Sequence, residues 1–103
     1  QAAKGWAELE AVEPNALARA YDQLTRDPAA HSNRQHRMKG NYATGQHEGD
    51  TFDRWQYEVT AAGRIWYFVE DPRPGPKRPS RGRRPRRRVL VEAVFVGHPK
   101  ATE

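Results

Sequence analysis

The stretch that decides the fold is residues 55–70, which read WQYEVTAAGRIWYFVE. Residues 55–60 alternate in character and are rich in β-forming side chains, and residues 64–70 are apolar at almost every position. The segment 61–63 between them, Ala-Ala-Gly, suits a tight turn. This stretch therefore predicts a β-hairpin whose second strand is apolar on both faces and central in a sheet.

The segments on either side of this hairpin differ in what they predict. The C-terminal segment predicts one further strand, and part of the N-terminal segment fits either a strand or a loop. Residues 89–96, VLVEAVFV, predict a last strand, interrupted only by Glu92. Residues 34–39 are polar and fit either a loop or an edge strand. Residues 40–53 contain three glycines and are expected to form a loop.

Two short antiparallel helices are predicted before the strands. Pro14 ends the first, over 4–12, and Asn15 is expected to cap the second, which stops before Pro28. Apolar residues at helical spacing mark one face of each: Trp6, Leu9 and Val12 in the first, and Leu17, Tyr21 and Leu24 in the second. The expected fold is α+β, a single domain over 1–103 with a two-helix hairpin on a three- to four-stranded antiparallel sheet.

The charge is concentrated in one segment. The chain has a net charge of +5, and residues 72–88 carry nine of its 18 Lys and Arg and no acid. The rest of the chain holds nine basic against 13 acidic residues, so the body is mildly acidic. Five prolines also lie in 72–88, and we expect an extended or disordered insertion outside the sheet. A basic block of this kind favours nucleic acid or another polyanion as a partner.

Composition narrows the other possibilities. The chain has no Cys, no apolar run that could span a membrane and no visible signal peptide, so we expect a cytoplasmic protein without a membrane partner. Its four His show neither H-x-x-x-H nor H-E-x-x-H spacing, so no metal and no other cofactor is expected.

The part of the chain that follows the predicted helices, from residue 34 onward, contains the residue types that RNA cleavage requires. A base must deprotonate the ribose 2′-OH, cations must stabilise the phosphorane, and an acid must protonate the 5′ oxygen. Histidine suits either proton role near neutral pH, and arginine matches two phosphate oxygens. The candidates are Arg34, His36, Arg37, Lys39, Glu58, Arg64, His98 and Lys100. In a chain this rich in Lys and Arg, such a set also arises without any catalytic role.

Two further features have both a functional and a structural interpretation. The basic cluster consists of Arg83, Arg84, Arg86, Arg87 and Arg88. It is either a phosphate contact without sequence preference or a solvated linker, and its high arginine content favours phosphate contact. The aromatic residues of the strands could stack on RNA bases, although most are expected to be core.

The order of these segments resembles the RelE/ParE superfamily of type II toxin–antitoxin toxins. The resemblance covers residues 4–71 and 89–103 and rests mainly on GRIWYFV at 63–69 and VGHPK at 96–100. It implies an N-terminal strand, a helical hairpin and three further antiparallel strands; the first strand is missing here. The insertion 72–88 is not part of the family pattern.

The resemblance implies one of two activities, opposed by a cognate antitoxin. RelE-like members enter the ribosomal A site and cut mRNA, whereas ParE-like members inhibit DNA gyrase without an active site. A non-catalytic RNA-binding relative is a third possibility. For a RelE-like toxin, Arg64 would stabilise the phosphorane, His98 would act as acid or base, and Arg37, Lys39 and Lys100 would hold RNA phosphates. The family's middle-strand lysines are replaced by Gln56 and Glu58, so Glu58 is the alternative base.

Overall fold

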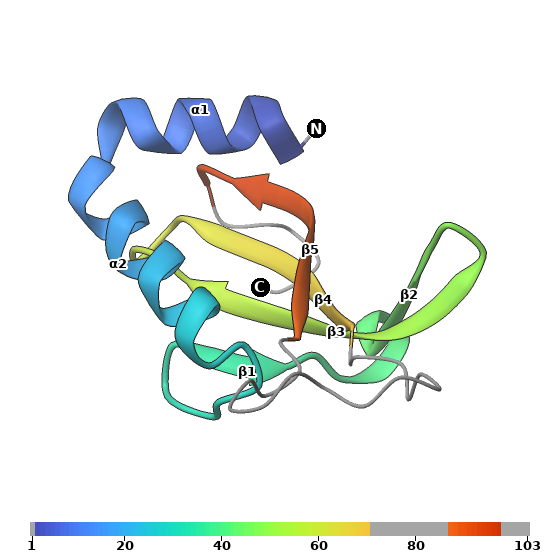
Figure 1. The fold of residues 1–103 in the computed structure, drawn as a ribbon. Coiled ribbons are helices and arrows are strands. Elements are labelled where there is room, and N and C mark those ends of the chain that lie inside the picture. Colours follow the sequence, from blue (N-terminus) through green and yellow to red (C-terminus); the bar gives the residue numbers. More distant parts are fainter. Residues whose placement is uncertain (1, 71–86, 98–103) are drawn as a thin grey trace, which may run out of the picture.

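The computed structural model describes residues 2–70 and 87–97 (Figure 1). It confirms the α+β class expected from the sequence, with two helices followed by antiparallel strands. In chain order the elements are α1 (Ala2–Val12), α2 (Pro14–Arg26), β1 (Gln35–Arg37), the 3-10 turn η1 (Gly40–Tyr42), β2 (Thr44–His47), β3 (Asp50–Glu58), β4 (Arg64–Glu70) and β5 (Arg88–Phe95). No helix in the described part of the chain is long and apolar enough to cross a membrane.

The helices begin and pack somewhat differently from the prediction. Pro14 occupies the first turn of α2, Glu13 is the N-cap, and no side chain caps the helix, so the cap expected from Asn15 is wrong. Pro at this position needs no capping acceptor, because it lacks the N–H that the start of a helix would otherwise leave unpaired. The buried face of α2 is formed by Ala16, Leu17, Ala20 and Leu24, while Tyr21 is 58% exposed. Figure 1 shows α1 beside β5 and α2 turning away from α1 toward β1.

The sheet has five strands among the described residues, more than the three or four expected. Its order is β1-β3-β4-β5, every pairing is antiparallel, and β2 also pairs with β3. The expected loop over 40–53 was wrong, because it contains η1, β2 and the start of β3. Glu48 and Gly49 both have positive φ, at 50° and 86°, which is the backbone that a tight two-residue hairpin turn requires.

The last strand is shifted by one residue from the predicted range 89–96, because it begins at Arg88 and ends at Phe95. β5 begins at Arg88, which pairs with Glu70, so the expectation that 72–88 stays outside the sheet is wrong at its final residue. Residues 71–86 lie outside the described part. Between Trp66 and Tyr67 the register of β4 with β5 shifts, and Glu92 is the extra residue of this β-bulge.

The two faces of the sheet have different neighbours. The helix-covered face presents Trp55, Tyr57, Ile65, Tyr67 and Val94, which form one core cluster with Leu9 of α1 and Leu17 of α2. Cross-strand pairing places the alternate residues on the other side, which we call the outer face: Arg54, Gln56 and Glu58 of β3, Arg64, Trp66 and Phe68 of β4, and Phe95 of β5.

A buried polar network ties the loop after α2 to the helix-covered face. The Gln35 side chain donates to the Asp27 carbonyl and to the Tyr67 hydroxyl, both at 2.9 Å. The Tyr67 hydroxyl in turn donates to the Pro28 carbonyl at 2.8 Å. All the hydrogen-bonding atoms of these two buried side chains therefore have partners, as stability requires.

Candidate functional site

Arg64 and Glu58 face each other across the hairpin at one end of the outer face. They are cross-strand partners in the β3–β4 register, and the Arg64 Nη2 lies 3.9 Å from the Glu58 Oε1. Nη1 of Arg64 donates to the carbonyls of Thr60 at 2.8 Å and Gly63 at 3.1 Å. The turn thus fixes one nitrogen of the guanidinium and directs the other toward the carboxylate.

The pair is asymmetric in its exposure to solvent. The side chain of Arg64 is 7% exposed, whereas that of Glu58 is 35% exposed. A separation of 3.9 Å is too long for a hydrogen bond. Within the described residues, Arg64 Nη2 is the only polar group that the Glu58 carboxylate contacts. The carboxylate is therefore accessible and loosely held, while the arginine is anchored.

Two other predicted residues lie at or near this end of the outer face. The Arg34 backbone carbonyl accepts a hydrogen bond from the Glu58 N–H at 2.6 Å, and the Arg34 guanidinium donates to the Glu58 carbonyl at 3.2 Å. His36 pairs with Gln56 in the β1–β3 register and is exposed. Four predicted residues thus share one surface: Arg34, His36, Glu58 and Arg64.

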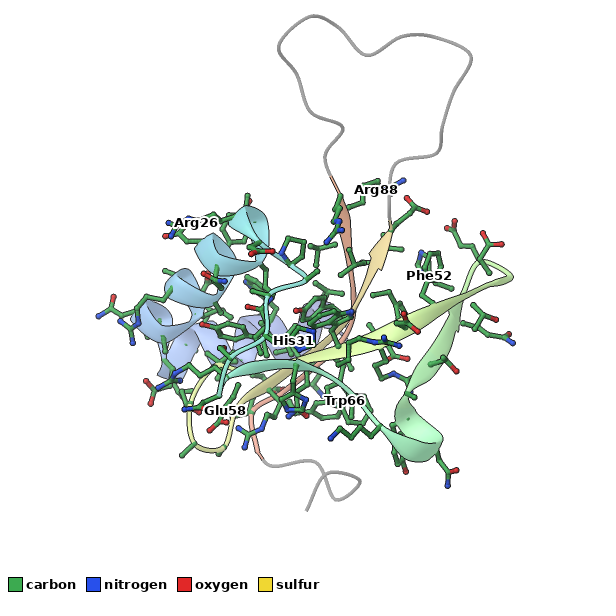
Figure 2. The ribbon with its side chains drawn as sticks, turned by 90° about the horizontal axis from the view of Figure 1, so that it is seen from below. Arg26, His31, Phe52, Glu58, Trp66 and Arg88 are labelled. Atoms are coloured by element: carbon green, nitrogen blue, oxygen red, sulfur yellow. The ribbon has the colours of Figure 1, made fainter. Side chains whose placement is uncertain are left out.

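The structure separates Arg37 and the described part of the basic cluster from this surface. Arg37 pairs with Trp55, a residue of the helix-covered face, and forms an ion pair with Asp53 at 2.8 Å. Arg88 forms an ion pair with Glu70 at 3.2 Å, six residues along β4 from Arg64, or about 20 Å at the usual rise per residue. Figure 2 shows Glu58 and Arg88 far apart, at opposite ends of the strands. Arg87 precedes Arg88, so the described part of the basic cluster lies at the end remote from Arg64 and Glu58.

Several candidates lie outside the described residues: His98, Lys100, Arg83, Arg84 and Arg86. The described chain ends at Gly97, two residues after Phe95, and Phe95 pairs with Arg64. β5 therefore leaves the sheet at the same end as Arg64 and Glu58. Lys39 is exposed just before η1.

The sequence interpretation missed a second arginine site on the outer face. Arg54 donates from Nε and Nη2 to the two oxygens of Glu92, each at 2.7 Å, and its guanidinium lies 5.5 Å from the Trp66 ring centre. A bidentate, half-buried pair of this kind is structural, because its donors are already occupied. The only sequence signal was Glu92 itself, an acid within an otherwise apolar strand.

A depression in the described part of the surface lies away from the Arg64–Glu58 pair. Its volume is about 480 Å³, and it is lined by residues of β2, β3 and the end of β4: Thr44, Asp50, Thr51, Phe52, Asp53, Val69 and Glu70. Three of these residues are acidic, so the depression is unsuited to a phosphate. No group of three His, Asp or Glu is placed to hold a metal ion within residues 2–70 and 87–97.

Comparisons with known proteins identify no relative: no family model, no curated protein and no solved structure matches this chain.

Proposed function

We propose that this chain is the toxin of a type II toxin–antitoxin system and cleaves mRNA on the ribosome without a metal. The observation that carries the proposal is the pairing of Arg64 with Glu58, an anchored cation and a loosely held base 3.9 Å apart on the face that the helices leave free. The sequence resemblance to RelE-like toxins, described above, supports the same reaction class.

The geometry suits attack of a ribose 2′-OH on the adjacent phosphate. Glu58 accepts the 2′-OH proton as the oxygen bonds to phosphorus, and the P–O5′ bond then breaks to leave a 2′,3′-cyclic phosphate. Because the Glu58 carboxylate is accessible and loosely held, it can turn toward the ribose while a phosphate oxygen takes its place at the Arg64 Nη2. Arg34 adds positive charge beside Glu58. His98, outside the described residues, is assigned as the acid that protonates O5′ by the resemblance alone.

The test is primer extension on mRNA from cells that express the full chain. We expect discrete cuts inside translated frames, and we expect Glu58→Gln to lower single-turnover cleavage on programmed ribosomes by roughly 10²–10⁴-fold. Arg64→Ala should lower it by roughly 10²–10³-fold. It should also lower the melting temperature, because two hydrogen bonds at the turn are lost.

The matched control is Arg19→Ala, which removes an exposed arginine of α2 and should leave cleavage and stability unchanged. Cleavage by Glu58→Gln at the wild-type rate would show that the site is misassigned. Growth arrest without any mRNA cuts would overturn the proposal and favour a gyrase inhibitor.

A further inference from the structure

A partly exposed aromatic residue lies on the outer face, on the same side of the sheet as the Arg64–Glu58 pair. Tyr42, the last residue of η1, is 40% exposed, and its ring centre is 5.8 Å from that of Trp66. Trp66 is two residues along β4 from Arg64 on the same face, about 7 Å at the usual rise per residue. Tyr42 therefore presents an aromatic surface in contact with Trp66, which is the next residue of β4 after Arg64 on the outer face.

The support beneath this ring is fixed. The indole N–H of Trp66 donates to the Gln56 side chain at 2.9 Å, and the Phe95 ring contacts Trp66 edge-on at 4.9 Å. The carbonyl of Tyr42 itself accepts from the Arg54 guanidinium at 3.3 Å. A ring that is held in place loses little conformational entropy when a ligand stacks on it, which favours binding.

The backbone that carries Tyr42 is also anchored at both ends. Met38 donates its N–H to the Arg54 carbonyl, and Arg54 donates its N–H to the Ala43 carbonyl, each at 2.8 Å. The intervening residues 39–42 leave the sheet and return to the same residue of β3. Lys39 is exposed at the start of this excursion and makes no ion pair with any residue that the structure describes.

We propose that Tyr42 is the stacking platform for an RNA base next to the scissile phosphate, and that Lys39 contacts the phosphate of the same nucleotide. This inference rests on the proposed function and names a subsite for its substrate. Base–aromatic stacking tolerates any base, because every base has a π-face. The subsite would thus fix the position of the RNA strand rather than its sequence.

The test is a coupling experiment on ribosomes programmed with mRNAs that carry one abasic ribose at each position flanking the cut. In the wild type, the abasic ribose at one position should lower single-turnover kcat/KM by about tenfold, a typical loss for one stacked base. Tyr42→Ala on intact mRNA should cause a similar loss. At that position the two changes together should cost no more than either alone, because they remove the same contact.

The controls separate stacking from other roles of the ring. Tyr42→Phe should retain wild-type cleavage and coupling, because stacking needs the ring and not the hydroxyl. Tyr21→Ala removes a comparably exposed ring on α2 and should have no effect. Lys39→Ala should weaken ribosome binding and make its salt dependence shallower by one counterion.

The outcomes distinguish this inference from the proposed function. If the wild type does not cleave any mRNA, the proposed function fails and the subsite fails with it. If the wild type cleaves but no abasic position shows coupling to Tyr42→Ala, the proposed function stands and the subsite is overturned. A folded Tyr42→Ala variant with wild-type kcat/KM on intact mRNA would overturn it equally.

Discussion

The two faces of the central sheet are both covered, but by different means. The helix-covered face packs Ile65 and Val94 against apolar side chains of α1 and α2. On the outer face, Trp66 and Phe68 are also buried, but they lie beside a bidentate Arg54–Glu92 ion pair and under the η1–β2 segment. One face is therefore held mainly by apolar packing and the other by interleaved aromatic and charged groups, and the site proposed above lies on the second.

The largest expected effect comes from adding a side-chain atom between α1 and the helix-covered face of the sheet. Gly5 allows α1 to lie directly on β5, since a Cβ at this position would collide with the Val94 carbonyl. We expect Gly5→Ala to destabilise the protein by about 3 kcal/mol, the upper end for overpacking, because the obstructing atom is backbone and cannot turn aside. The helix propensity that Ala gains over Gly, at most about 1 kcal/mol, does not offset this loss.

Thermal unfolding followed by circular dichroism checks this prediction, with an expected fall in melting temperature of about 10 °C or more. Gly97→Ala is the control, because a Cβ there has nothing within 4 Å. An unchanged melting temperature in Gly5→Ala would show that α1 is free to shift away from β5.

The second prediction concerns the polar network on the helix-covered face. Tyr67→Phe removes the hydroxyl that donates to the Pro28 carbonyl. It also leaves one N–H of the Gln35 side-chain amide without its acceptor. We expect a loss of about 2 kcal/mol at neutral pH. Burial raises the pKa of the Tyr67 phenol above its ordinary value of 10.0, so the folded state favours the neutral hydroxyl.

The sign of the pH dependence follows from this shift. The Tyr67 contribution is fully present below pH 10 and declines above it, because the phenol ionises in the unfolded chain before it does so in the folded one. Urea unfolding between pH 7 and 11 should show the stability difference between wild type and Tyr67→Phe constant up to about pH 9 and shrinking above pH 10. A difference that stays constant up to pH 11 would mean that Tyr67 is not shielded from water.

The smallest expected effect comes from a glycine-to-alanine substitution on the outer face, which corresponds to Gly5→Ala on the helix-covered face. A Cβ at Gly45 of β2 would meet the Arg54 guanidinium and, at 2.8 Å, the Phe68 ring. These are side-chain atoms that can adjust, so we expect Gly45→Ala to cost only about 1 kcal/mol. Thermal unfolding beside the exposed control Thr44→Ala measures this loss. A loss as large as that of Gly5→Ala would show that the outer layer is packed as rigidly as the helices.

The sequence predicted the centre of this fold because the decisive pattern is local. The hairpin 55–70 is confirmed as the end of β3 and all of β4, and the apolar run of 64–70 matches a strand covered on both sides. The region 40–53 was misjudged because its glycines suggest a loop. Gly49 provides the positive φ of a hairpin turn, and Gly45 leaves room for Phe68. The positive φ at Gly49 and the small size required at Gly45 can be recognised only once the neighbouring strands are in place.

The candidate site was predictable in residue type but not in arrangement. Arg64 and Glu58 were identified from chemistry, and only the register shows that they face each other while Arg37 and Arg88 lie elsewhere. Tyr42 and Arg54 could not be found, because their roles depend on long-range contacts with Trp66 and Glu92. Alternation along a strand indicates which residues share a face, but it does not show what covers that face.

The backbone of Arg54 binds the residues on both sides of the loop 39–42, and this arrangement allows the sequence of the loop to change during evolution. Because the N–H and the carbonyl of one strand residue bind the two ends, residues can be added or exchanged within the excursion without altering the pairing of β1 or β2 with β3. Lengthening such a loop costs little closure entropy, about 0.6 kcal/mol for each doubling. New contact surfaces can therefore be tried at this edge by insertion or exchange while the rest of the molecule keeps its form.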